Sequence, residues 1–238
     1  MGHDFGTYYK KYASDKTSAG KHAFIEKTMQ FISLEINNTF HGMDIYPVVG
    51  NNDSYTGDYS SIVNGEFFHN TAEDWSDFIK SSKNRAAFLQ QFPKAGYYSV
   101  TLSQQPNLRF IFMNTVLFSS KARGKGVDAA AQQQLAWLED ELNAAHQNKQ
   151  KVYIAMHIPP GIDVYTTLKT RLLTLVQFWK PEYVERYEGL LRQHADDVYA
   201  VFSGHLHSDW FQVLTFSDSE AEIPVTGTPS ISPLFGNN

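Results

Sequence analysis

The stretch VYIAMHIPPG, residues 152–161, gives the strongest indication of the fold, because its apolar run ends in a histidine and a Pro-Pro-Gly loop. Residues 151–156 have the length and apolar content of a buried strand. Two other segments share this design, YPVVGNND at 46–53 and YAVFSGHLH at 199–207. Loops at the carboxyl ends of strands converge above an α/β sheet, and ligands bind there. The sequence therefore predicts one ligand site built where three strands end.

Helical and strand patterns alternate along the rest of the chain. We expect helices over 20–38, 72–92 (stopped by Pro93) and 128–147, and a partly helical region around 165–195 that Pro181 divides. The expected strands are 44–49, 97–102, 109–114, 151–156, 198–203, 210–216 and 223–226, with a turn at 105–107. This alternation predicts an α/β fold, and the late run of strands favours mixed sheets. We expect a single domain over residues 1–238.

Composition limits the classes of function. With 42% apolar and 19% charged residues, the 238-residue chain is an ordinary globular sequence. A net charge of -5 lacks the basic field that attracts nucleic acid, so no nucleic-acid partner is expected. There is no cysteine, so any metal must be held by His, Asn, Asp or Glu. No stretch approaches the roughly 20 apolar residues of a transmembrane segment, and the first residues do not form a signal peptide.

Asn51, His157, His205 and His207 are the candidate metal ligands. Imidazole nitrogen and amide oxygen suit zinc, manganese or iron. In an extended Gly204-His205-Leu206-His207 segment, the two imidazoles would point to the same side, toward one metal or two adjacent ones. Each residue alone has a structural interpretation, because a histidine after a strand is more often a hydrogen-bonded structural residue. The ordered set of three motifs favours a site.

The set G-N-N-D, M-H-x-P-P-G and S-G-H-L-H resembles the calcineurin-like metallophosphoesterases, and most of all the acid sphingomyelinase-like phosphodiesterases. The resemblance implies a four-layer α/β/β/α sandwich with two mixed sheets and a centre of two divalent ions (Zn, Mn or Fe). By that resemblance, Asn51, His157 and His205 look like ligands of one metal and His207 like a ligand of the other. It also implies hydrolysis of a small-molecule or lipid-headgroup phosphodiester by a metal-bridging hydroxide, and favours a secreted or periplasmic location.

The chain also departs from the family pattern. The D-x-H and G-D motifs that begin the family's domain are absent, and His3-Asp4 resembles a pair that follows them. We therefore expect the first one or two strands and the bridging Asp to be missing, leaving at most one weak metal site. Asn52 replaces a family histidine, and an amide cannot act as a general acid, so His3 is the candidate proton donor.

Three interpretations follow from these residues. The first is an active metal-dependent phosphodiesterase. The second is a catalytically incompetent fragment or binding module with an incomplete metal site, and the third is an unrelated α/β enzyme with structural histidines. Six aromatic residues are candidates for a substrate groove, although most aromatics in such a chain belong to the core: Tyr8, Tyr9, Tyr55, Tyr59, Tyr165 and Trp179.

Overall fold

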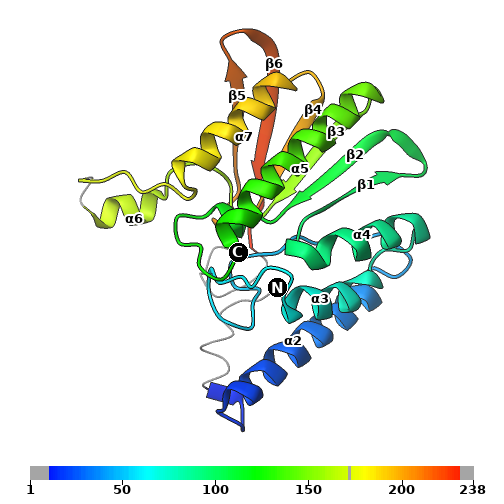
Figure 1. Ribbon diagram of the computed structural model, residues 1–238, viewed down its shortest axis with the longest axis vertical. Helices are drawn as coiled ribbons and strands as arrows, with labels where there is room; N and C mark the ends of the chain where they lie inside the picture. Colours follow the sequence, from blue (N-terminus) through cyan, green and yellow to red (C-terminus); the bar gives the residue numbers. More distant parts are fainter. Residues whose placement is uncertain (1–10, 171–172, 231–238) are drawn as a thin grey trace.

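A computed structural model of the chain describes residues 11–170 and 173–230. Its centre is one mixed six-stranded sheet in the order β1-β2-β3-β4-β6-β5 (Figure 1). The strands are β1 (Tyr98–Leu102), β2 (Gln105–Met113), β3 (Lys151–Met156), β4 (Val198–Ser203), β5 (Trp210–Phe216) and β6 (Ser219–Gly227). Strands β2, β3, β4 and β6 run parallel, and the edge strands β1 and β5 pair antiparallel. The parallel run brings the carboxyl ends of β2, β3 and β4 to one edge of the sheet.

Two groups of helices pack against this sheet (Figure 1). The long helices α5 (Val127–Gln147) and α7 (Pro181–Gln193) cover one face. Helices α2 (Ser18–Thr39), α3 (Glu66–Ser76) and α4 (Ser82–Ala95) form a second group beside β1. A short 3-10 helix, η1 (Thr115–Phe118), follows β2, and α6 (Val164–Lys169) projects away from the body.

The alternation of side chains along β2 divides the core in two. Ile111 and Met113 are fully buried on the face that α5 covers. Phe112 points to the other face, where its ring stacks on Tyr98 with centroids 4.6 Å apart. Tyr98 in turn meets Phe88 of α4 edge-on at 4.8 Å. Aromatic pairs of this geometry add to the stability gained from burial, so β1 and β2 are held between both helix groups.

The described residues contain one mixed sheet, so the expected α/β class is confirmed and the expected second sheet is not seen. The face of β4 and β5 turned away from α5 and α7, here called the open face, carries Tyr199, Phe202, Phe211 and Val213. All four are exposed, Phe211 to 78%. Tyr153 of β3 continues this aromatic row, with its ring 6.1 Å from that of Phe202.

The expected strand at 44–49 is wrong. This segment is extended but belongs to no ladder. Pro47 has no N–H to donate, and its carbonyl accepts a hydrogen bond from the Tyr98 hydroxyl at 2.8 Å. The N–H of Ile45 donates to the carbonyl of Phe78 at 3.0 Å. The segment is therefore fixed against the sheet by scattered bonds rather than by strand pairing.

Two other expected boundaries are wrong as well. The helix expected over 72–92 is two helices, because Ser81 caps α4 by accepting from the N–H of Asn84 at 3.4 Å. Pro93 lies inside α4, which ends instead at Gly96 in the left-handed conformation (φ 81°). The turn between β1 and β2 falls at residues 103–104 rather than 105–107.

Most remaining elements agree with expectation, although β2 and β6 each begin four residues earlier than predicted, at Gln105 and Ser219. The expected helices at 20–38 and 128–147 correspond to α2 and α5, and β3, β4 and β5 have the predicted bounds. Pro181 occupies the first turn of α7, where its missing N–H costs nothing. Within residues 11–170 and 173–230, no helix combines the length and apolar content needed to cross a bilayer.

Candidate metal site

Asn51, His157 and His205 meet at the carboxyl edge of the sheet. Asn51 Oδ1 lies 2.8 Å from His157 Nε2 and 3.1 Å from His205 Nδ1. The two imidazole nitrogens are 3.4 Å apart. Three residues separated by up to 154 positions in sequence thus point their donor atoms at one place.

His157 follows β3, and two glycines make room for its ring. A Cβ atom built on Gly50 would lie 3.2 Å from His157 Nε2, and one on Gly204 would lie 3.4 Å from Nδ1. The N–H of Gly204 also donates to the His157 carbonyl at 3.0 Å. Thr115 fixes the next residue by accepting from the N–H of Ile158 at 2.8 Å. Gly50 and Gly204, from the first and third motifs, therefore define the position of His157 in the second motif.

A carboxylate orients Asn51. The side-chain amide of Asn51 donates to Asp58 Oδ1 at 2.7 Å, which turns its own oxygen toward the two histidines. Such outer partners fix the orientation of ligands around metals. Asp53 is buried and accepts from the N–H of Gly50 at 2.9 Å, which tightens the loop.

The Gly204–His207 segment is not extended, so the expected geometry of its two histidines is wrong. Strand β4 ends at Ser203, and His205 (φ 70°) and His207 (φ 57°) both adopt the left-handed conformation. Histidine is one of the few residues enriched there, and such strain is concentrated at functional sites. The turn brings His205 Nε2 to 3.3 Å from the Tyr59 hydroxyl, itself on a residue with φ 55°.

Burial keeps both converging histidines neutral. It lowers the pKa of His157 well below the usual value, and the nearby His205 adds to the effect. Burial likewise lowers the pKa of His205 to about 4, with a further contribution from the charge of Lys121. The charge of His207 also lowers the pKa of both. At neutral pH both imidazoles therefore have lone pairs to offer a cation.

The spacing of these donors is close to that of ligands around one metal ion. Ligands at about 2.0–2.2 Å from a tetrahedral zinc-like ion lie roughly 3.3–3.5 Å from one another. The 3.4 Å between the imidazoles matches this spacing, and the 2.8 and 3.1 Å contacts of Asn51 are hydrogen-bond lengths that would open by a few tenths of an ångström. Across residues 11–170 and 173–230, no three His, Asp or Glu side chains form a metal-holding group.

Other expected site residues are placed elsewhere or not described. His3, Tyr8 and Tyr9 lie outside the described residues. Tyr55 packs on His22 in a pocket of about 190 Å³ beside the Asn51 loop. Trp179 is buried, and Tyr165 is exposed on α6. Among the described aromatic candidates, the hydroxyl of Tyr59 contacts a candidate ligand, His205. No sequence motif indicated Asp58, because its contact with Asn51 depends on the turn of an irregular loop.

Comparison with known proteins shows distant relatives of the chain. The chain is 26% identical to the cyclic GMP-AMP phosphodiesterase of Mus musculus over 210 residues, covering 88% of this chain and 44% of that protein. It is 25% identical to the human acid sphingomyelinase-like phosphodiesterase 3b over 218 residues, covering 90% and 44%. The chain is a distant homologue of the acid sphingomyelinase-like phosphodiesterases. The family predicted from the three motifs is thereby confirmed.

The relationship to acid sphingomyelinase-like phosphodiesterases extends beyond mammals. Sphingomyelinase phosphodiesterase D of Dictyostelium discoideum is 30% identical over 214 residues, covering 87% of this chain and 45% of that protein. No protein-family model matches the chain. The chain spans less than half the length of these curated relatives.

Proposed function

We propose that the chain supplies part of the active site of a metal-dependent phosphodiesterase, with a lipid-headgroup or nucleotide phosphodiester as substrate. The observation that carries the proposal is the convergence of two neutral imidazoles and one amide oxygen within 2.8–3.4 Å of one another. The relatives include a cyclic GMP-AMP phosphodiesterase and a sphingomyelinase phosphodiesterase, which supports this class of substrate.

The residues of the chain have separate tasks in this proposal. His157 and His205 offer neutral nitrogens, and Asp58 holds the Asn51 oxygen toward them. With Nδ1 of His205 directed at the cation, its Nε2 carries the proton and donates to the Tyr59 hydroxyl 3.3 Å away. This second bond fixes the tautomer, as is usual for metal-binding histidines.

A divalent ion bound there would supply positive charge that polarises the phosphoryl oxygens. His207, two residues after His205 in the same loop, is proposed to face the position of a second ion, which this chain alone is not expected to hold. His3 is proposed to protonate the leaving alcohol, because the Asn52 amide beside the site cannot release a proton at neutral pH.

Isothermal titration with Zn²⁺ and Mn²⁺ tests the site, and hydrolysis of bis(4-nitrophenyl) phosphate tests the activity. We expect one divalent ion per chain, with binding lost in His157→Ala and His205→Ala. Hydrolysis should require added metal and be slow. Two ions held through dialysis against chelator, or hydrolysis unchanged in both variants, would refute the arrangement.

A binding module without catalysis is the second candidate. Two described carboxylates of the Asn51 loop are already engaged, Asp58 with the Asn51 amide and Asp53 with the N–H of Gly50. Neither bridges toward a second ion in this arrangement. Metal binding with no metal-dependent hydrolysis of nitrophenyl or alkyl phosphodiesters would favour this candidate.

A further inference from the structure

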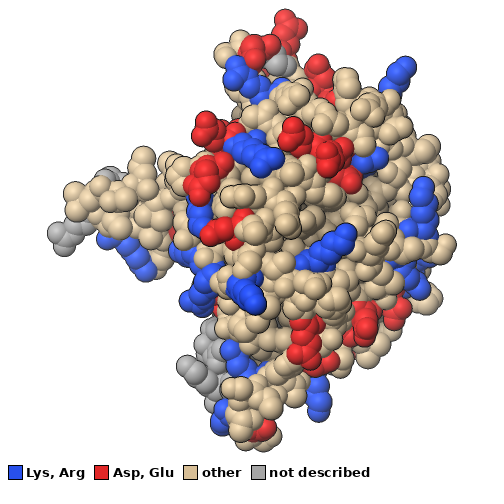
Figure 2. Space-filling view, in the orientation of Figure 1, with Lys and Arg blue, Asp and Glu red and all other residues tan. Residues whose placement is uncertain are grey.

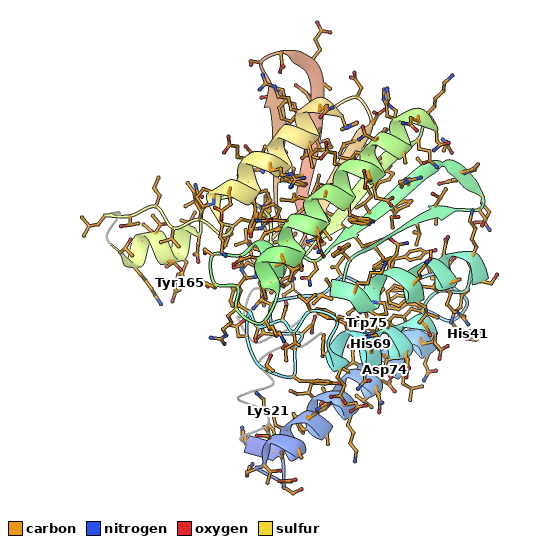
Figure 3. All side chains as sticks on the ribbon, viewed as in Figure 1. Lys21, His41, His69, Asp74, Trp75 and Tyr165 are labelled. Atoms are coloured by element: carbon orange, nitrogen blue, oxygen red, sulfur yellow. The ribbon has the colours of Figure 1, made fainter. Side chains whose placement is uncertain are left out.

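A projecting segment of the chain exposes an unusual number of apolar side chains. Residues 162–170 and 173–176, here called the arm, extend from the body and include α6 (Figures 1 and 3, where Tyr165 marks its position). Their exposed fractions run from 43% to 86%, and the residues concerned are Ile162, Val164, Tyr165, Leu168, Leu173 and Leu175. Contiguous apolar surface on the order of several hundred Å² marks interaction sites on soluble proteins.

The polar groups of the arm are used inside it. Asp163 Oδ1 caps α6 by accepting from the N–H of Thr166 at 2.9 Å. Thr167 is buried, and its hydroxyl accepts from the N–H of Val176 at 3.0 Å. The Thr170 hydroxyl donates to the Thr167 carbonyl at 2.7 Å. A short helix facing water normally points its polar side chains outward, whereas here they tie the arm together and its apolar side chains face outward.

The arm has no exposed carboxylate among its described residues. Asp163 is buried and lies 3.4 Å from the ammonium of Lys121 at the base of the arm. Lys169 is exposed and stands 4.2 Å over the ring of Tyr165. Figure 2 shows the projection as largely tan, with blue side chains along its lower edge and at its neck. On a chain with net charge -5, the arm is thus an apolar element whose one exposed charge, among its described residues, is the positive charge of Lys169.

The geometry points to the surface of a lipid bilayer containing anionic lipid as the partner of the arm. Aliphatic side chains enter the acyl boundary, tyrosine settles at the headgroup level and lysine pairs with anionic headgroups. A narrow convex arm suits a deformable bilayer, whereas a protein partner would need a matching groove.

The neck of the arm is joined to the candidate metal site. The ring of Phe178 meets His205 edge-on with centroids 5.4 Å apart. Trp179 Nε1 donates to the carbonyl of Ile158, next to His157, at 3.0 Å. Insertion of the arm would therefore hold the candidate site close to lipid headgroups. Docking on a bilayer is a property beyond the proposed activity. It favours a lipid-headgroup phosphodiester over a nucleotide as the substrate.

Co-sedimentation of the full chain with vesicles tests the inference, in the absence of metal and substrate. The vesicles are phosphatidylcholine alone or with roughly 30 mol% phosphatidylserine. We expect Leu168→Glu to weaken binding to the anionic vesicles at least about tenfold, because it removes an exposed aliphatic group that would enter the bilayer and adds a charge that anionic lipid repels. Leu34→Glu on α2 is the matched control, since Leu34 is 55% exposed and Leu168 is 58% exposed. Wild-type affinity in Leu168→Glu, or equal loss in both variants, would overturn the inference.

Charge is tested separately. Lys169→Glu should reduce binding to anionic vesicles several-fold more than Lys83→Glu on α4, with little change for neutral vesicles. The preference for anionic vesicles should weaken at high salt. No preference for anionic lipid at low salt would overturn the choice of partner.

Two further outcomes would assign vesicle binding to another surface or give the arm another partner. Loss of vesicle binding in Phe211→Glu, with Leu168→Glu unaffected, would assign binding to the open face. A concentration-dependent dimer by light scattering that Leu168→Glu abolishes, without vesicle binding by the wild type, would make the arm an interface between copies. Because binding is measured without metal, these results are independent of whether the chain is a phosphodiesterase.

Discussion

Replacing Gly50 by alanine should damage the candidate metal site without a direct change to any ligand. The new Cβ would lie 3.2 Å from His157 Nε2 and 3.3 Å from Cδ2 and Cε1 of the same ring. These distances are shorter than ordinary contacts, so the ring must move by a few tenths of an ångström. It has little room to move, because the Gly204 backbone stands against its other side.

The size of the effect follows from that displacement. Moving the ring alters the 2.8 Å contact with Asn51 and the 3.4 Å spacing to His205 together. We expect Zn²⁺ affinity to fall about 10–100-fold, as when the support of a ligand is lost. Crowding in a packed region should also cost about 1–3 kcal/mol of unfolding free energy.

Titration calorimetry with Zn²⁺ and chemical denaturation measure both quantities. Gly189→Ala is the control, because nothing lies within 4 Å of its added Cβ and it sits in α7. This control should bind metal normally and gain about 0.5–1 kcal/mol of stability. Gly204→Ala should fall between the two, since its Cβ would make an ordinary 3.4 Å contact. A folded Gly50→Ala protein with wild-type Zn²⁺ affinity would refute the view that the position of His157 determines binding.

Three other substitutions test separate features. Gln134→Ala should lower the unfolding free energy by about 2–4 kcal/mol in chemical denaturation, because it removes bonds of 2.7 and 3.0 Å to buried main-chain groups at the end of β2. Burial raises the pKa of Asp74 (Figure 3) to about 6, and Glu26 adds to the shift. Because folding raises this pKa, the protonated carboxyl contributes stability that is fully present below about pH 4 and is lost as the pH rises through 6. In denaturation curves, Asp74→Asn should therefore match the wild type in unfolding free energy at pH 4 and exceed it by roughly 1 kcal/mol at pH 8. Asp58→Ala should weaken Zn²⁺ binding about tenfold in calorimetry at unchanged Tm, because this exposed carboxylate only orients the amide of Asn51.

Much of the fold was predictable because the apolar pattern and the structure have the same cause. Strands β3 and β4 have the bounds that their apolar runs indicate, and α5 buries the face predicted from Leu135, Leu138 and Leu142. The segment at 44–49 has a similar apolar pattern but no neighbouring strand in the described sheet. Strand formation requires a partner, and local composition does not report one.

The candidate site was predictable as a set of residues but not as a geometry. The motifs indicated Asn51, His157 and His205, whose donor atoms the structure brings together. The left-handed turn at His205 depends on its neighbours, and its contact with Tyr59 joins residues 146 positions apart. Contacts between residues so far apart in sequence produce no periodic pattern in the sequence. The apolar residues of the arm also resemble core residues in sequence, and only the structure reveals their exposure.

The open face has a practical consequence for work with the isolated chain. Tyr199, Phe202 and Phe211 are exposed on this face, and β5 is an edge strand of the described sheet. Exposed apolar surface next to an edge strand promotes self-association as the protein concentration rises. Sample handling, more than intrinsic folding, will therefore limit concentration, and dilute conditions with mild detergent suit the first solution measurements.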